Sequence, residues 1–392
     1  MSALKKIIFS LPWLSKSSLR IIRRCRKAGK LELPDKMNNQ PVQVLGGLNF
    51  EGINMYLIQE NEIKEHDYVT YARQFDSYRW FKPVLTMFFF AIFFIFFNLL
   101  ITAAAGAADF MITGGDWKSF LGRLNQGYDN IGTTDPVGCA LTLGSMASAI
   151  PAFWFARGIV RERPYSSYMS SRGGWGWWIF FKCLIIALLV SALPNFVYEY
   201  YYLGHKTIES HFVNYGLYFL IVLCPLQCIG EEYLFRGLIN QALGAWFRVP
   251  VIAIVLSAIG FAALHPYNVV GQVAILISGI ALGVSSWFGR GLEVSSALHI
   301  ANNMTAFLMD GYGITKIGSE IDIKSAVLSV IIDIVYAGII VFLFYKTDWF
   351  DRAKFDDAQS HNAYLEAKRQ KKAAKKAAKK AKRQAKKEAK AA

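Results

Sequence analysis

Long apolar runs alternate with short polar connections from Val84 to about residue 347. Runs of about 20 apolar residues match the length of a helix that crosses a bilayer. They predict eight transmembrane helices, near residues 84–106, 137–157, 175–194, 214–235, 250–267, 269–289, 292–310 and 325–346. We therefore expect an all-α polytopic membrane protein. Its site should be formed by the later helices, because polar residues interrupt those apolar runs.

The composition supports this expectation. Of the 392 residues, 54% are hydrophobic and 15% are aromatic, which is too apolar for an ordinary soluble protein of this length. The first long apolar run begins too late to be a cleavable secretory leader. Cys25 lies in a basic segment and the other cysteines lie in apolar runs, a distribution that does not resemble a disulfide framework.

The connections between the expected spans differ in charge. Those at 157–173, 236–249 and 290–291 are rich in arginine. The alternate connections are acidic and carry Asp109, Asp116, Asp129, Asp135, Glu199, Glu209, Asp310, Glu320 and Asp322. Because cytoplasmic loops carry an excess of Lys and Arg, the pattern predicts that both termini are cytosolic.

Three regions follow: a basic cytosolic region at 1–83, a transmembrane domain at 84–347, and a Lys/Ala-rich cytosolic tail at 348–392. The first 27 residues mix apolar and basic positions, which suits an interfacial helix or a disordered basic terminus equally. Residues 361–392 hold thirteen Lys and Arg against two Glu, and so carry +11 of the net charge of +15. We expect basic termini that contact anionic lipid, and no specific nucleic-acid partner.

Three polar clusters interrupt the later spans: Glu231-Glu232-x-x-x-Arg236, Phe261-x-x-x-His265 and His299-x-x-x-Asn303. Residues four apart share a helix face, so Glu232 and Arg236 are expected to form a structural pair, with Phe261 as a further supporting residue. Glu231 points about 100° away from Glu232 and remains free for chemistry. Ionisable groups at membrane depth are costly, so the clusters should converge on one hydrated cavity.

Helix lengths give a geometric test of that convergence. If the fourth helix continues to Arg248, then Glu231 and His265 are each 17 residues from the turn. At about 1.5 Å per residue, an antiparallel hairpin places them at one depth. His299 is nine residues from Arg290 and matches this depth less well. It is the weakest geometric link in the predicted site.

Two chemistries fit a carboxylate with two imidazoles. In the first, which we favour, Glu231 is the general base for a water, and His265, His299 and Asn303 hold that water or stabilise the oxyanion. In the second, Glu231, His265 and His299 bind a divalent metal such as zinc. The His-Glu-x-x-His signature of common zinc proteases is absent from the sequence. Either chemistry predicts hydrolysis, and a peptide bond is the favoured target.

The ordered motifs EExxxR, FxxxH and HxxxN resemble the CPBP family, which includes type II CAAX prenyl endopeptidases and bacteriocin-processing homologues. The resemblance covers about residues 175–310. It implies an intramembrane endopeptidase of the glutamic or metallo type, with Glu231, His265, His299 and Asn303 as catalytic residues. It also implies a multi-pass protein of a bacterial plasma membrane that acts on a membrane-associated protein or peptide. The choice of Asn303 over Asn302 rests on the i+4 spacing.

Two other functions are open at this point. A non-catalytic membrane protein of the same fold could act as an immunity factor or scaffold for a partner. A transporter could use Glu231 together with Asp333, which lies inside the last apolar span. The repeated broken helices typical of transporters are not evident. For Asp333 we expect structural pairing with a group on another helix in preference to proton coupling.

Overall fold

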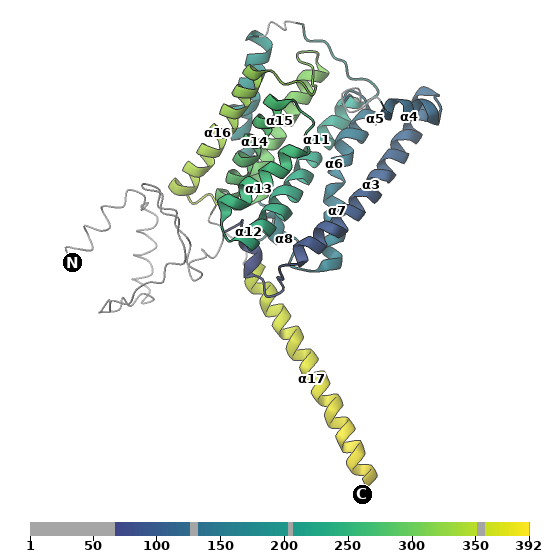
Figure 1. Cartoon of the computed structure of the whole chain (residues 1–392), viewed down its shortest axis with the longest axis vertical. Coiled ribbons are helices and arrows are strands. Elements are labelled where there is room, and N and C mark those ends of the chain that lie inside the picture. Colours follow the sequence, from purple (N-terminus) through teal and green to yellow (C-terminus); the bar gives the residue numbers. More distant parts are fainter. Residues whose placement is uncertain (1–66, 126–131, 203–206, 351–356, 392) are drawn as a thin grey trace, which may run out of the picture.

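The computed structural model describes residues 67–125, 132–202, 207–350 and 357–391 (Figure 1). These residues form helices and turns without a strand, and one isolated bridge joins Ser170 to Gly291. The expected all-α class is therefore confirmed. The predicted interfacial helix near the N-terminus lies outside the described residues.

Helical segments correspond to each of the apolar runs. The first four are α3 (Lys82–Thr113); α5–α7 (Pro136–Val160); α9 (Trp177–Ala187) with α10 (Leu193–Val197); and α11 (Gly216–Glu232) with α12 (Gln241–Phe247). The others are α13 (Pro250–Ala263), α14 (Val269–Phe288), α15 (Leu292–Gly311) and α16 (Ile323–Lys346). Short helices α4 (Trp117–Asn125) and α8 (Ser166–Met169) lie in connections, and α17 (Asp357–Ala391) follows the last span.

Six of these segments are long and apolar enough to cross a membrane, judged over the described residues. The exceptions are α13, with 14 residues, and α15, which is more polar. The predicted span at 250–267 is too long, because the helix ends at Ala263 and His265 lies in the turn that follows. Both exceptions belong to the part of the bundle that carries the polar motifs.

The first span is a lipid-facing helix. Few of the 32 residues of α3 are buried, and its Phe-rich surface is largely exposed, as suits a helix surrounded by acyl chains. It packs along α7 (Ala149–Val160), where Phe90, Ala152 and Phe153 contribute to one buried cluster. Pro83 in its first turn and Gly114 at φ 65° after its last turn are typical helix boundaries.

Helix α15 lies at the centre of the opposite half of the bundle and packs against α9, α11 and α14. Every residue from Leu292 to Ala301 is buried. Its start is anchored by Glu293, which forms an ion pair with Arg172 at 2.9 Å and accepts a hydrogen bond from the Gly176 amide at 2.6 Å. Because these contacts fix where α15 begins, they also fix the depth of His299.

The fourth span continues through the predicted site to Arg248, as the depth argument requires. Between α11 and α12 it widens into a π-helical stretch, η7 (Tyr233–Asn240). It is one of four π-helical stretches among the described residues, and it begins directly after Glu232. Arg248, at φ 61°, ends the helix. The widened turn displaces the residues after Glu232 from ordinary helical register.

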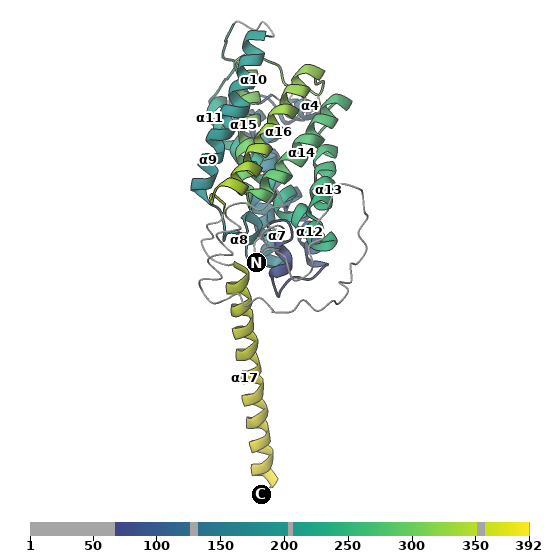
Figure 2. The same cartoon turned by 90° about the vertical axis from the view of Figure 1, so that its left-hand side faces the viewer.

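The C-terminal helix α17 extends away from the bundle (Figures 1 and 2). Its base is attached: Ala358 packs with Tyr71 and Phe75, and the Asn362 amide donates to Gln74 O at 2.9 Å. Ser77 Oγ lies 3.1 Å from His361 Nε2. The cytosolic side of this end remains a prediction.

Candidate functional site

The centre of the site is a buried carboxylate that holds two cationic or polar partners. Glu232 is 0% exposed. Its Oε1 lies 2.9 Å from Arg236 Nη1 on the next turn and 2.9 Å from Nδ1 of His299 on α15. Glu232 therefore joins α11 to α15 as well as pairing with Arg236, and it fixes the orientation of the His299 ring.

Arg236 is held by more than this ion pair. Its Nη2 donates to Gly279 O on α14 at 3.1 Å, and its guanidinium carbon lies 4.5 Å from the centre of the Phe261 ring. The cation thus contacts α13 and α14 as well as Glu232. The structural role of Arg236 and Phe261 stays a prediction, and these contacts are the reason to keep it.

Glu231 lies beside this network, and only one of its two carboxylate oxygens accepts a hydrogen bond from the described residues. Its Oε1 accepts a hydrogen bond from Gln227 Nε2 at 2.6 Å. Its Oε2 is 3.5 Å from His299 Nε2 but receives no hydrogen bond of good geometry from the residues that the structure describes. The residue is only 6% exposed, so this oxygen is buried without a hydrogen-bond donor in the described part of the chain.

The histidine nearest to Glu231 is His299, and no contact joins Glu231 to His265 among the described residues. His265 Nδ1 lies 2.8 Å from Phe261 O. The Phe261 ring centre is 4.6 Å from the His265 ring and 6.0 Å from the His299 ring. The sequence predicted that His265 would lie beside Glu231 and that His299 would fit less well, but the structure places His299 beside Glu231. The reason is that α13 ends before His265, while the anchored start of α15 brings His299 to the carboxylates.

Asn303 joins the site through a residue that the sequence analysis missed. Its Nδ2 donates to Gln227 Oε1 at 3.1 Å, while the amide of Gln227 donates to Glu231. Gln227 is four residues before Glu231 and shares its helix face. A polar side chain in an otherwise apolar run was the signal that could have found it.

A second buried network surrounds Asp333 on α16. Asp333 accepts a hydrogen bond from Asn302 Nδ2 at 3.0 Å and another from Ser278 Oγ on α14. Asn302 in turn accepts from Ser191 Oγ. Asp333 thus has partners on other helices, in agreement with structural pairing. Asn302, set aside on helix spacing, binds this network while Asn303 joins the first.

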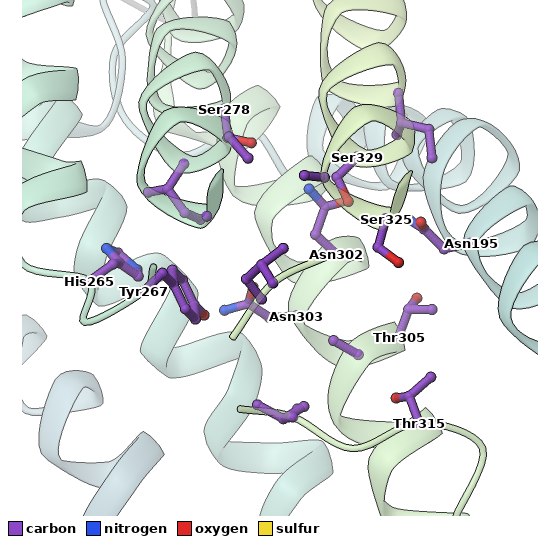
Figure 3. Close-up of a pocket in the computed structure, with 18 of the residues that line it drawn as sticks. Asn195, His265, Tyr267, Ser278, Asn302, Asn303, Thr305, Thr315, Ser325 and Ser329 are labelled. Carbon is purple, nitrogen blue, oxygen red and sulfur yellow. The ribbon is translucent and has the colours of Figure 1, made fainter. Parts of the chain in front are cut away.

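Both networks border one cavity of about 510 Å³ between α13, α14, α15 and α16. In Figure 3, His265 and Tyr267 lie on one side of it, Asn302 lies on the other, and Asn303 lies between them. His299 also lines the cavity and connects it to Glu231. The clusters therefore meet beside one space of a size typical of ligand pockets.

The alternative ligands for a metal, Glu231, His265 and His299, do not converge on one point. Among the residues that the structure describes, no three His, Cys, Asp or Glu side chains are grouped so as to hold a metal ion. His299 contacts Glu232, and His265 contacts the Phe261 carbonyl, in both cases through Nδ1. Each Nε2 is therefore available, but the two Nε2 atoms and Glu231 are not gathered into a set of three. The donor set therefore does not fit zinc in this arrangement, and we derive no step through a metal.

Comparison with known proteins gives an independent result. A family model described as type II CAAX prenyl endopeptidase Rce1-like matches residues 212–305. This region is therefore similar to the family that the motifs resemble. The Rce1-like region begins just before α11 and includes all three motifs. It is a family of proteases, which agrees with the expected hydrolase class.

The chain is also similar to a bacterial protein of unknown role. It is 24% identical over 167 residues to the uncharacterized protein YyaK of Bacillus subtilis (strain 168). The similar region covers 40% of this chain and 56% of that relative, so the chain spans about half of the relative's length. No solved structure matches the chain. With its apolar helices, this is an integral multi-pass membrane protein, and the Bacillus relative is consistent with a bacterial plasma membrane.

Proposed function

We propose that this protein is an intramembrane endopeptidase in which Glu231 activates the water that hydrolyses a peptide bond of a membrane-associated protein or peptide. The observation that carries the proposal is the buried Oε2 of Glu231. It is 3.5 Å from His299 Nε2 and accepts no hydrogen bond of good geometry from the described residues. A water held to the side of this pair can donate to Glu231 Oε2 and contact His299 Nε2 at the same time.

In the proposed reaction, Glu231 removes a proton from water as the water oxygen attacks the peptide carbonyl carbon. The carbonyl π electrons move to oxygen and form a tetrahedral oxyanion. When the oxyanion collapses, the C–N bond breaks and Glu231 passes its proton to the leaving nitrogen. The products are an amine and a carboxylic acid, which then passes its proton to the amine or to water, and the base is restored.

The two buried carboxylates have different roles, because Glu231 is the base and Glu232 orients His299. With Nδ1 protonated and bound to Glu232, the imidazole of His299 is held in one orientation beside Glu231. Arg236 balances the charge of Glu232, so that carboxylate remains an acceptor. We assign Glu232 and Arg236 as positioning residues, and His299 as the group that holds the water.

Asn303 and His265 are proposed to act on the substrate side. Asn303 lines the cavity one bridging residue away from Glu231, and its amide can turn from Gln227 to the oxyanion. His265 lines the same cavity from the turn after α13. We assign it to binding the carbonyl group of the substrate, because it does not contact Glu231.

The decisive experiment compares membranes that contain the wild-type protein with membranes that contain Glu231→Gln. Quantitative proteomics should find one or more peptides that accumulate uncut in the variant. Cleavage of such a peptide by purified protein should fall by a factor of about 10²–10⁴, the usual contribution of a general base. His299→Ala should show a similar loss.

Two matched controls lie at exposed positions of one connection: Glu209→Gln and His211→Ala should leave cleavage unchanged. Full activity of folded Glu231→Gln protein would falsify the mechanism. If that variant also replaced the wild type in a deletion strain, the result would favour the non-catalytic immunity or scaffold role.

A further inference from the structure

The cavity carries more negative than positive charge. Its lining includes four carboxylates, Glu199, Glu320, Asp322 and Asp333, and one ammonium group, Lys316. A cleft lined by one sign of charge with low-dielectric walls concentrates ligands of the opposite sign. The cavity is therefore suited to a cation.

Three of these carboxylates also serve the fold around the cavity mouth. Glu320 Oε2 accepts from Asn268 Nδ2 at 2.9 Å, and Glu199 Oε1 accepts from Ser325 Oγ at 3.3 Å. Asp322 caps α16 by accepting from the amides of Lys324 and Ser325. These groups lie at the ends of helices and in the connection before α16. They contribute to the field of the mouth but have local structural reasons to be acidic.

Asp333 has no such position. It lies in the middle of α16, is 1% exposed, and borders the deep part of the cavity. Its hydrogen bonds come from the neutral groups of Asn302 and Ser278, and no basic side chain pairs with it among the described residues. An ionised carboxylate offers about four acceptor positions, so two remain for a ligand.

A carboxylate with neutral partners alone is costly at membrane depth, because no ion pair balances its charge. The site beside it contains a buried carboxylate, Glu232, whose charge is balanced by the guanidinium of Arg236 at 2.9 Å. Asp333 has no such cationic partner among the residues that the structure describes. A positively charged ligand bound in the cavity would supply one.

We propose that the cavity binds a peptide segment with a lysine or arginine side chain, and that Asp333, positioned by Asn302 and Ser278, receives this cation. The inference rests on the proposed function, and it names the class of substrate. Asn302 and Asn303 are consecutive on α15, so the cation site and the site around Glu231 are built on one turn. Binding the basic side chain would thus fix which peptide bond lies beside Glu231.

The cavity mouth indicates the side from which the segment enters. Lys316, Glu320 and Asp322 belong to the connection between α15 and α16. The 24 residues of α16 then run about 36 Å to Lys346, at the end from which α17 departs. The segment therefore enters from the face opposite the C-terminal helix.

The test measures binding by Glu231→Gln protein, so it does not depend on catalysis. Purified protein in uncharged maltoside detergent is titrated with fluorescent apolar peptides that differ at one position, which is lysine, arginine, glutamine or norleucine. Scanning that position along the peptide should reveal one register in which lysine and arginine bind at least about tenfold tighter than glutamine. Asp333→Asn in the same background should remove this preference, and Glu209→Gln should retain it.

Equal binding of lysine and glutamine peptides in every register would overturn the inference. This comparison needs no variant of Asp333, so it remains decisive even if Asp333→Asn folds poorly. A preference that survives in folded Asp333→Asn protein would also overturn it. Cleavage without a basic preference would leave the proposed function standing and remove only this inference. If the protein prefers basic peptides but the wild type cleaves none of them, the cation site stands and the proposed function is removed.

Discussion

Arg236 balances a carboxylate that is wholly enclosed by protein, and its removal gives the sharpest test of the site's architecture. In Arg236→Met the side chain keeps much of its length but loses the charge 2.9 Å from Glu232. Removing one partner of a buried ion pair typically costs about 3–5 kcal/mol, because the other charge remains buried and uncompensated. We expect a loss of that size in the free energy of unfolding.

The origin of the loss can be separated by a double-mutant cycle. In a Glu232→Gln background no carboxylate is left uncompensated and Arg236→Met also removes an unpaired buried cation, so it should cost at most about 1–2 kcal/mol. That remainder is the lost hydrogen bond to Gly279 O and the lost contact with the Phe261 ring. The two costs should therefore differ by at least about 2 kcal/mol.

The assay is reversible unfolding of purified protein in detergent, followed by tryptophan fluorescence. Arg79→Met serves as a control, because Arg79 is exposed and, within the described part of the chain, its side chain bonds only to nearby backbone carbonyls. It should change stability by less than about 0.5 kcal/mol. If Arg236→Met costs the same in the wild-type background as in the Glu232→Gln background, the argument from an uncompensated carboxylate is refuted.

Three further predictions concern other contacts. Gln227→Leu should lower peptide cleavage by about 10–100-fold while the protein stays folded, because it removes the bridge from Glu231 to Asn303; unchanged kinetics would exclude that positioning role. Gly244→Ala should lower the thermal midpoint, with a cost of about 1–3 kcal/mol, since a Cβ there would lie 2.3 Å from a backbone oxygen; an unchanged midpoint would contradict this packing. Burial lowers the pKa of His361, as do nearby cations, so protonation should favour release of the base of α17, and attachment should weaken as pH falls through about 6.5. Hydrogen exchange at residues 358–364 at pH 5.5 and 7.5, corrected for intrinsic rates, should show this difference, and His361→Gln should abolish it.

Much of the membrane architecture could be predicted from local pattern. A span needs about 20 apolar residues, so hydropathy alone located the helical segments, including the path of the fourth to Arg248. The pairing of Glu232 with Arg236 is similarly local, because i and i+4 side chains meet on any helix. The ordered motifs were sufficient to indicate the family that the match to residues 212–305 supports.

The arrangement of the site depended on contacts between distant segments. Counting residues along a hairpin paired Glu231 with His265, whereas the structure brings His299 to both glutamates. The count assumed straight helices of full length, but α13 ends at Ala263. The depth of His299 depends on the anchoring of Glu293 by Arg172, which lies far earlier in the chain.

Sequence by itself determined which residues must avoid lipid, because the cost of a charge or an amide in hydrocarbon depends only on the group and its depth. It also determined which of them share a helix face. Only the tertiary structure decided their partners: Gln227 with Asn303, Asn302 with Asp333, and Glu232 with His299. Those pairings depend on helix ends, on the π-helical turn after Glu232 and on packing between helices, since hydrogen bonds require atoms within about 3 Å.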